Sequence, residues 1–344
     1  MATIKDVARE AGVAYSTASI AMRGVGKVAP ATRERVLRVA QLLGYRANAA
    51  ASVLAGGRNY RRETSRGLQV AYLSTSARAP SVRPDSLLRG VESECERLGY
   101  GLQSVSFAQL QRKGAADRLW HRGVEGLIIG ETHGPALESF AFPWHRFAVV
   151  KIRRILPWLS VDMVRASAPE MIFKGLNAII ERGYRSILCL LMPTPSRLDD
   201  DLRVGAVYAY QQRHLPEGVR LSWAEFTPAE ECPNADQELH RHMSAHHPDV
   251  VLGFSTAFYH ALQRSGYAVP QDVAYAGFPI FREEQPPDAK RQFFAGIDAN
   301  IGEQGAMAMR HLHDLLRTGS KGEKETPAQY LLETNWIDGA TLPC

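Results

Sequence analysis

Cysteine is scarce in this sequence and widely spaced. The 344 residues contain four cysteines, at 95, 189, 232 and 344, and no two of them form a CxxC pair. This spacing argues against a disulfide framework of the small secreted kind and against a zinc site built on paired cysteines. It favours free thiols in a reducing cytoplasm.

Long apolar runs are also missing. No apolar stretch in the sequence reaches the roughly 18 residues that a membrane-spanning helix needs. The first residues do not form the apolar segment of a secretion signal. We therefore expect a cytoplasmic protein with no membrane partner.

The sequence lacks the signatures of several enzyme classes, because it contains no GxSxG, no HExxH and no phosphate-binding loop. Its one dense group of potential metal ligands is His240, His242, His246 and His247, in which His242 and His246 stand one helical turn apart. A solvated helix face beside Pro248 is the alternative interpretation, and we favour it. We expect no enzyme activity, no cofactor and no metal.

Positive charge is concentrated at the amino-terminal end. Residues 1–62 carry eleven Lys/Arg and three Asp/Glu, a net charge of +8. The whole chain carries +5, so the remaining 282 residues sum to −3. A basic amino-terminal segment is what a phosphate-binding surface requires, and the length predicts a small domain followed by a larger one.

Three short helical patterns occupy the first 43 residues. The first follows Thr3 as a candidate N-cap and ends at Gly12, because glycine takes the positive φ of a helix end at least cost. The second runs from about Tyr15 to Met22. The third begins near Pro30, and its predicted inward-facing residues are Val36, Val39, Ala40 and Leu43. Two helices joined by such a turn form a helix-turn-helix, whose second helix can enter the DNA major groove.

This segment closely resembles the lac repressor family of bacterial transcription regulators. The shared features are TIKDVA at 3–8, AGV at 11–13, STAS at 16–19, TRERV at 32–36, LGY at 43–45, and then Asn48, Ala51 and Leu54-Ala55. The resemblance implies a helix-turn-helix domain over residues 1–46. It implies a hinge helix and linker over 47–66, for which a plain alanine-rich linker helix is the alternative, and an effector-binding, dimerising core over 67–344.

The resemblance also implies which residues contact DNA. Tyr15, Ser16 and Thr17 would reach base edges, whereas Thr3, Ser19, Arg23, Thr32 and Arg33 would contact phosphates. Asn48 and Leu54 belong to the hinge, and Leu54 matches a residue that wedges between base pairs in the minor groove. Ile20 stands where the family usually has arginine, so it either contacts a thymine methyl or reads no base.

Strand and helix patterns alternate after residue 67, which predicts parallel sheets built from βαβ units. The predicted strands are 69–74, 102–106, 126–130, 146–151, 186–191, 250–254, 273–277 and 295–298. The predicted helices are 85–98, 110–122, 168–182, 203–214, 235–245, 258–265 and 302–317. The order resembles a periplasmic-binding-protein-like α/β core of two doubly wound parallel-sheet subdomains.

By that resemblance the chain crosses between subdomains near residues 162, 293 and 323. Subdomain 1 would comprise about 67–161 and 294–322, and subdomain 2 about 163–293 and 323–344. No leucine heptads follow Trp336, so we expect a homodimer and no tetramer.

The resemblance places an effector in the cleft between the subdomains, at the carboxyl ends of the strands. The implied contacts are Lys151, Asp199, Arg203, Phe254 and Pro279. Several family carboxylates and amides are replaced here, including by Lys151 and Pro279. Two alternatives follow: an anionic, sugar-derived effector facing Lys151 and Arg203, or a cleft that has lost or altered small-molecule control.

The sequence thus predicts a DNA-binding transcription regulator, a repressor that is dimeric on a palindromic duplex operator and controlled by a small-molecule effector. A cytoplasmic small-molecule-binding protein of the same fold, with effector control lost or altered, is the alternative. An exported solute-binding protein would share the core fold but would have no use for residues 1–60.

Overall fold

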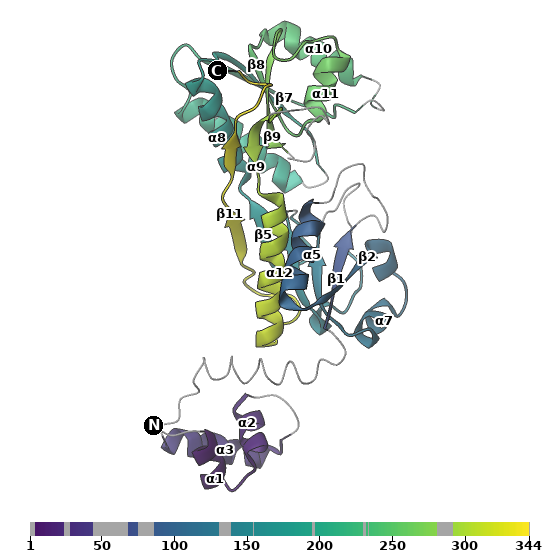
Figure 1. Cartoon of the computed structure of the whole chain (residues 1–344), viewed down its shortest axis with the longest axis vertical. Coiled ribbons are helices and arrows are strands. Elements are labelled where there is room, and N and C mark those ends of the chain that lie inside the picture. Colours follow the sequence, from purple (N-terminus) through teal and green to yellow (C-terminus); the bar gives the residue numbers. More distant parts are fainter. Residues whose placement is uncertain are drawn as a thin grey trace. The chain divides into compact units, whose positions relative to one another are not determined.

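The chain divides into two compact units, Met1–Arg66 and Gly67–Cys344, which we describe separately (Figure 1). The structure, a computed structural model, describes residues 4–23, 28–43, 68–74, 86–130, 139–153, 155–194, 197–229, 232, 234–280 and 292–343. The predicted hinge and linker over 47–66 lie outside these ranges, as do Thr3, Asn48 and Leu54.

The amino-terminal unit contains the three predicted helices, α1 (Ile4–Glu10), α2 (Tyr15–Arg23) and α3 (Pro30–Leu42). Gly12 has a φ of +62°, and its position in the turn after α1 confirms the predicted glycine stop. Small side chains fill the shared core: Val7, Ala8, Ala11, Ala18, Ala21, Val36 and Ala40. The inward orientation predicted for Leu43 is wrong, because that residue follows the end of α3 and is 38% exposed.

The larger unit contains two six-stranded sheets. The first has the order β11-β5-β4-β3-β1-β2 and the second the order β12-β10-β9-β8-β6-β7. The first sheet comprises β1 (Gln69–Ser74), β2 (Gly101–Ser106), β3 (Val124–Ile129), β4 (Ala148–Ile152), β5 (Asp162–Ala166) and β11 (Gln329–Leu332). The second comprises β6 (Ser186–Leu191), β7 (Arg220–Glu225), β8 (Val250–Gly253), β9 (Ala274–Ile280), β10 (Ala295–Asp298) and β12 (Asn335–Ile337).

Helices connect and cover these strands (Figure 1). With the first sheet go α5 (Ser86–Leu98), α6 (Phe107–Leu110), α7 (Ala115–His121), the 3-10 turn η1 (Trp144–Arg146) and α12 (Ile301–Thr318). With the second sheet go α8 (Ala168–Glu181), α9 (Arg197–Arg213), α10 (Ala235–His246) and α11 (Ala257–Arg264). We call these two assemblies the first half and the second half of the core.

All eight predicted strands are present, and the strands of each half pair in parallel apart from β12, which is antiparallel to β10. The predicted helix over 110–122 is instead two short helices, α6 and α7, separated by a turn in which Gly114 has a φ of +73°. Strands β5, β7, β11 and β12 were not predicted, because their short sequences lack a clear apolar run.

The predicted crossing points are displaced. β5 pairs with β4 in the first sheet, so the first crossing comes at Ser167 and not near residue 162. β10 pairs with β9 in the second sheet, which moves the second crossing from 293 to about Ala299. β11 pairs with β5, so the third crossing follows Leu332 and not 323. In each case backbone pairing keeps a short strand in the sheet that the chain is about to leave.

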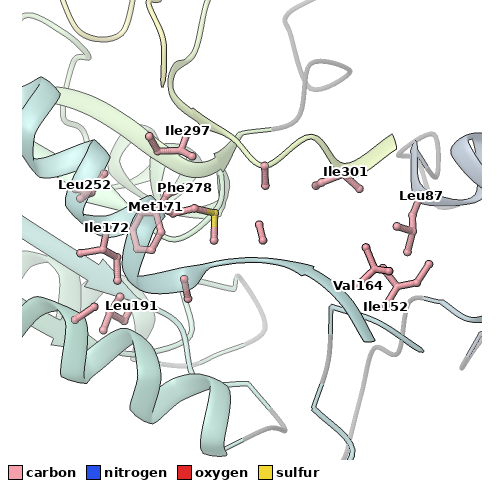
Figure 2. Packing of buried hydrophobic residues seen from close by; sticks show 14 of the residues in the cluster. Leu87, Ile152, Val164, Met171, Ile172, Leu191, Leu252, Phe278, Ile297 and Ile301 are labelled. Atoms are coloured by element: carbon pink, nitrogen blue, oxygen red, sulfur yellow. The ribbon is translucent and has the colours of Figure 1, made fainter. Parts of the chain in front are cut away.

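A continuous hydrophobic cluster runs through both halves (Figure 2). Leu87, Ile152, Val164 and Ile301 lie in one part of it, and the other part contains Met171, Ile172, Leu191, Leu252, Phe278 and Ile297. All ten are at most 7% exposed. Burial of these apolar side chains provides the main favourable contribution to the free energy of folding.

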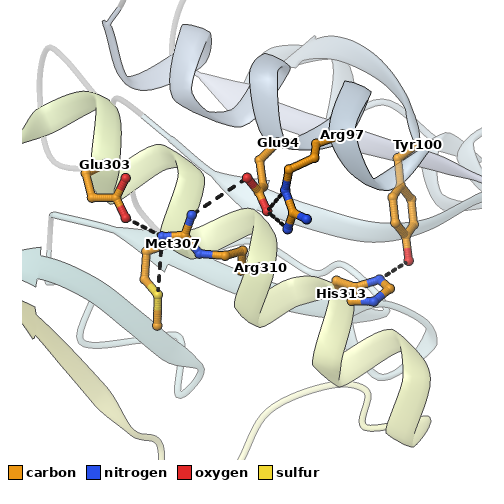
Figure 3. Close-up of polar contacts among 7 residues, drawn as sticks. All are labelled: Glu94, Arg97, Tyr100, Glu303, Met307, Arg310 and His313. Atoms are coloured by element: carbon orange, nitrogen blue, oxygen red, sulfur yellow. Dashed lines mark hydrogen bonds and ion pairs between the residues drawn. The ribbon is translucent and has the colours of Figure 1, made fainter. Parts of the chain in front are cut away.

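Helices α5 and α12 pack closely against each other through glycine. A Cβ atom on Gly90 of α5 would lie 1.9 Å from the carbonyl oxygen of Gly302 in α12, and one on Gly305 would lie 2.1 Å from the carbonyl oxygen of Leu87. Polar contacts border this seam (Figure 3): Glu94 pairs with Arg97 and Arg310, and the Tyr100 hydroxyl lies 2.8 Å from His313 Nδ1. Glycine is therefore required where the two backbones touch.

We predict that Gly90→Ala lowers the free energy of unfolding of the core by about 2 kcal/mol or more, because the added methyl group forces the helices apart. Denaturant unfolding followed by circular dichroism measures this loss. Gly205→Ala is the matched control, since a Cβ at Gly205 of α9 meets nothing within 4 Å. That control should be neutral or stabilising by up to about 1 kcal/mol. Equal effects of the two substitutions would contradict the close packing.

Candidate functional site

Helix α2 buries one face and presents the other. Ala18 and Ala21 are buried against α1 and α3, whereas Tyr15 is 52% exposed and Ser16 is also exposed. Thr17 and Ile20 are half-buried. Tyr15 and Ser16 therefore lie at the start of the helix with their side chains available to a partner, as a recognition helix requires.

The residues predicted to contact phosphates are only partly described. Thr32 and Arg33 are half-buried in the first turn of α3, where the Arg33 amide donates to the carbonyl of Ala29 over 3.0 Å. Ser19 and Arg23 belong to α2, but their side chains lie outside what the structure describes, and so do Thr3, Asn48 and Leu54. Their DNA contacts stay predictions.

The predicted effector residues lie in the core near strand ends. Lys151 is in β4 of the first half, and Asp199 and Arg203 are in the first turns of α9, which follows β6 in the second half. Phe254 follows β8 directly, and Pro279 is buried inside β9. The structure brings Arg203, Asp199 and Phe254 together and adds Arg165 of β5, which sequence reasoning did not identify.

Lys151 does not present a free ammonium group. Its side chain is buried, and Nζ donates to the carbonyl of Leu159 over 2.8 Å and more weakly to that of Leu156 over 3.5 Å. Burial lowers the pKa of this lysine. The ammonium group that we predicted to face an anionic effector is therefore bound by backbone carbonyls of the loop after β4.

Arg203 is held on two sides. One terminal nitrogen donates to Asp200 and lies 3.4 Å from the carbonyl of Met192, and the guanidinium carbon lies 4.4 Å from the centre of the Phe254 ring. Burial lowers the pKa of Arg203, and the nearby carboxylate of Asp200 opposes that shift. Asp200 in turn accepts from the Thr194 amide and hydroxyl, so the arginine is fixed in place.

The Nε donor of Arg203 is buried and has no acceptor among the described residues. A buried donor without an acceptor is costly, so such an atom points to a ligand or water oxygen that completes its hydrogen bonding.

Asp199 joins the two halves. Its Oδ1 lies 2.9 Å from a terminal nitrogen of Arg165, and its Oδ2 accepts from the Ile155 amide over 3.3 Å. Both side chains of the ion pair are about one-tenth exposed. Arg165 was missed because its strand β5 was not predicted, and only its burial in the structure shows that it needs an anionic partner.

The residues that replace family ligands near β8 and β9 make local contacts. Ser255 has a φ of +68°, and its amide donates to the carbonyl of Phe278 over 3.3 Å. Phe254 packs edge-on against Phe278, with ring centres 5.6 Å apart. Phe278 is fully buried in the core, whereas Phe254 is only half-buried.

Of the four histidines at the end of α10, His240 and His247 are exposed, and His242 and His246 are half-buried. His242 stacks on Phe226 at a ring-centre distance of 6.1 Å and on His246 at 6.0 Å. Within the described ranges no group of three or more His, Cys, Asp or Glu side chains is arranged to hold a metal ion. Nor does any helix in those ranges have the length and apolar character needed to cross a membrane.

Known proteins resemble the chain in both of its units. Residues 3–48 match the family model described as "Bacterial regulatory proteins, lacI family". The sucrose operon repressor of Escherichia coli is 27% identical over 293 residues, which cover 81% of this chain and 84% of the repressor.

Solved structures share the fold. The lac repressor dimer bound to operator and the anti-inducer ONPF superposes with a TM-score of 0.55 at 18% identity, covering 100% of this chain and 99% of that one. A complex of the transcriptional regulator CelR with cellobiose gives a TM-score of 0.54 at 22% identity, with 99% and 100% covered. Residues 3–48 therefore form a helix-turn-helix segment of the lacI family of bacterial regulatory proteins, and the two-sheet core shares the fold of the lac repressor.

Proposed function

We propose that this DNA-binding regulator represses transcription by binding a palindromic operator as a homodimer, with α2 in the major groove. The observation that carries the proposal is the exposure of Tyr15 and Ser16 on α2, opposite a buried alanine face. The net charge of +8 over residues 1–62 supports it, because phosphate contacts require such a surface. The likeness to a lac repressor dimer on its operator is a further support.

The mechanism we propose couples the core to the DNA-binding unit through residues 47–66. A small molecule that favours one arrangement of the two halves would change the order of the paired hinge helices. The ligand shifts the equilibrium between the two arrangements of the halves only by the difference between its binding free energies for them. We further propose that the protein acts in the cytoplasm and has no catalytic activity, since its relatives bear the names of repressors and regulators.

For the effector we propose a neutral, hydroxyl-rich compound. Lys151 is buried with its ammonium group donating to loop carbonyls, and Arg203 pairs with Asp200, so neither presents an accessible unpaired charge to an anion. The buried Nε of Arg203 requires an oxygen acceptor, which a sugar hydroxyl provides. The half-buried ring of Phe254, which lies beside the Arg203 guanidinium, suits the apolar face of such a ligand. The names of the sucrose repressor and the cellobiose complex point to the same class.

We predict that Tyr15→Ala weakens binding to a selected operator by about tenfold to a hundredfold, because a base-edge contact is lost. The salt dependence should stay nearly unchanged, since phosphate contacts remain. Fluorescence anisotropy across a salt series measures both. Leu37→Ala on α3 is the control, because Leu37 is comparably exposed at 45% but is not on the recognition helix. Failure of the wild-type protein to bind any selected duplex in a salt-sensitive way would refute operator binding.

The isoleucine at position 20 leads us to predict an operator that differs at one base pair from those of arginine-containing relatives. Isoleucine cannot form the bidentate guanine contact of an arginine, so selection from random duplexes should return no guanine requirement at that base pair. Ile20→Arg should restore a guanine preference of about tenfold or more. Recovery of the same guanine-dependent half-site by both proteins would show that Ile20 does not decide this position.

Arg203→Lys should abolish the response to the effector while leaving the core folded, because lysine retains the charge beside Asp200 but has no Nε and no planar fork. A thermal-shift screen of neutral sugars and their acids against the wild-type protein identifies the ligand. The variant should then bind it at least about tenfold more weakly by calorimetry. Arg213→Lys, at an exposed position of the same helix, is the control. Tight binding of sugar acids but not of neutral sugars would contradict the proposed class.

A further inference from the structure

The start of α9 carries three consecutive aspartates with three different surroundings. Asp200 accepts from Thr194 and Arg203 within the second half. Asp201 is exposed. Asp199 is 7% exposed and makes its contacts with the first half of the core. Adjacent residues of the same type therefore have distinct roles, and Asp199 is the one that crosses the junction.

The opposite half approaches both oxygens of Asp199, Oδ1 through an ion pair and Oδ2 through a hydrogen bond, and Oδ1 accepts no hydrogen bond from any described residue. Arg165 in β5 approaches Oδ1 at 2.9 Å, and the backbone amide of Ile155, in the loop after β4, donates to Oδ2 over 3.3 Å. A guanidinium and a main-chain amide converging on one carboxylate is the arrangement by which proteins bind free carboxylate ligands. Here the carboxylate comes from the chain itself.

We propose that Arg165 and the Ile155 amide form a carboxylate-binding subsite in the cleft, and that Asp199 is its tethered ligand. The two halves are thereby linked by a ligand-like contact before any small molecule enters. An effector carrying a carboxylate would have to displace Asp199, whereas a neutral effector beside Arg203 would not. The consequence for DNA binding rests on the proposed function, but the subsite itself does not.

The proposal makes Asp199 replaceable by a free anion. Asp199→Gly removes the side chain and leaves Arg165 and the Ile155 amide without their carboxylate, in a space that formate or acetate can enter. Asp199→Asn keeps the shape and the acceptor for Ile155 but removes the charge that Arg165 needs. The first variant should therefore be rescued by small carboxylates, and the second should not.

The test uses the full-length protein in the absence of DNA. Both variants should melt several degrees below wild type. Formate or acetate should raise the melting temperature of Asp199→Gly and bind it at least about tenfold more tightly than wild type by calorimetry. Formamide and acetamide, which have the same shape without charge, should have no effect, and neither should chloride at equal ionic strength.

Two further variants locate the effect. Asp201→Gly is the matched control, because it introduces the same helix-weakening glycine on the same helix at an exposed position. Adding Arg165→Gln to Asp199→Gly should abolish the rescue by carboxylates. Combining Arg165→Gln with Asp199→Asn should lower the melting temperature by less than the sum of the single effects, since each removes the same pair.

The proposal is overturned if Asp199→Gly melts like Asp201→Gly, or if carboxylates rescue it equally with and without Arg165. It is also overturned if the effects of Arg165→Gln and Asp199→Asn are additive, a result that stays informative should the glycine variant fail to fold. Absence of operator binding by the wild-type protein would refute the proposed function alone, because none of these measurements involves DNA.

Discussion

The junction between the two sheets depends on how buried charges are compensated. Each of four charged residues at this junction has a side chain less than about one-seventh exposed: Arg165, Asp199, Asp200 and Arg203. Charges in such surroundings are tolerated when they are paired and hydrogen-bonded. The Arg203–Asp200 pair meets both conditions, whereas Arg165 and Asp199 form an ion pair that links the halves without a well-aligned hydrogen bond to Asp199 Oδ1. Few polar groups at the junction are therefore left to bind a ligand, and the main one is the Nε donor of Arg203.

In the DNA-binding unit the constraint is the small volume of the side chains in the core between its three described helices. The buried residues of its core are alanine and valine, contributed by α1, α2 and α3. The inner face of α2 carries small residues, and the larger and polar side chains described for this helix lie on the solvent-exposed face. This is why Tyr15 and Ser16 are exposed while Ala18 and Ala21, within the same two turns, are buried.

Much of the architecture was predictable because it follows from local patterns. β1, β6 and β10 begin and end where the apolar runs do, and α8, α10 and α12 agree with their helical spacing to within a residue or two. β7, β11 and β12 were missed because they are edge strands with alternating or mostly polar sequences, and β5 was missed beside the edge strand β11. Their strand conformation comes from pairing with a partner that is distant in the chain. The crossing points were displaced for the same reason.

The sequence by itself determined the family, the helix-turn-helix, the alternation of strands and helices, and the neighbourhood of the cleft residues. These are properties of residue spacing, caps and periodicity, which act over a few residues. The tertiary structure alone decided which charges in the cleft are free. Lys151 turns to the carbonyls of Leu159 and Leu156, and Asp199 finds Arg165, because partners far apart in the chain meet there and a buried charge takes the nearest group that compensates it.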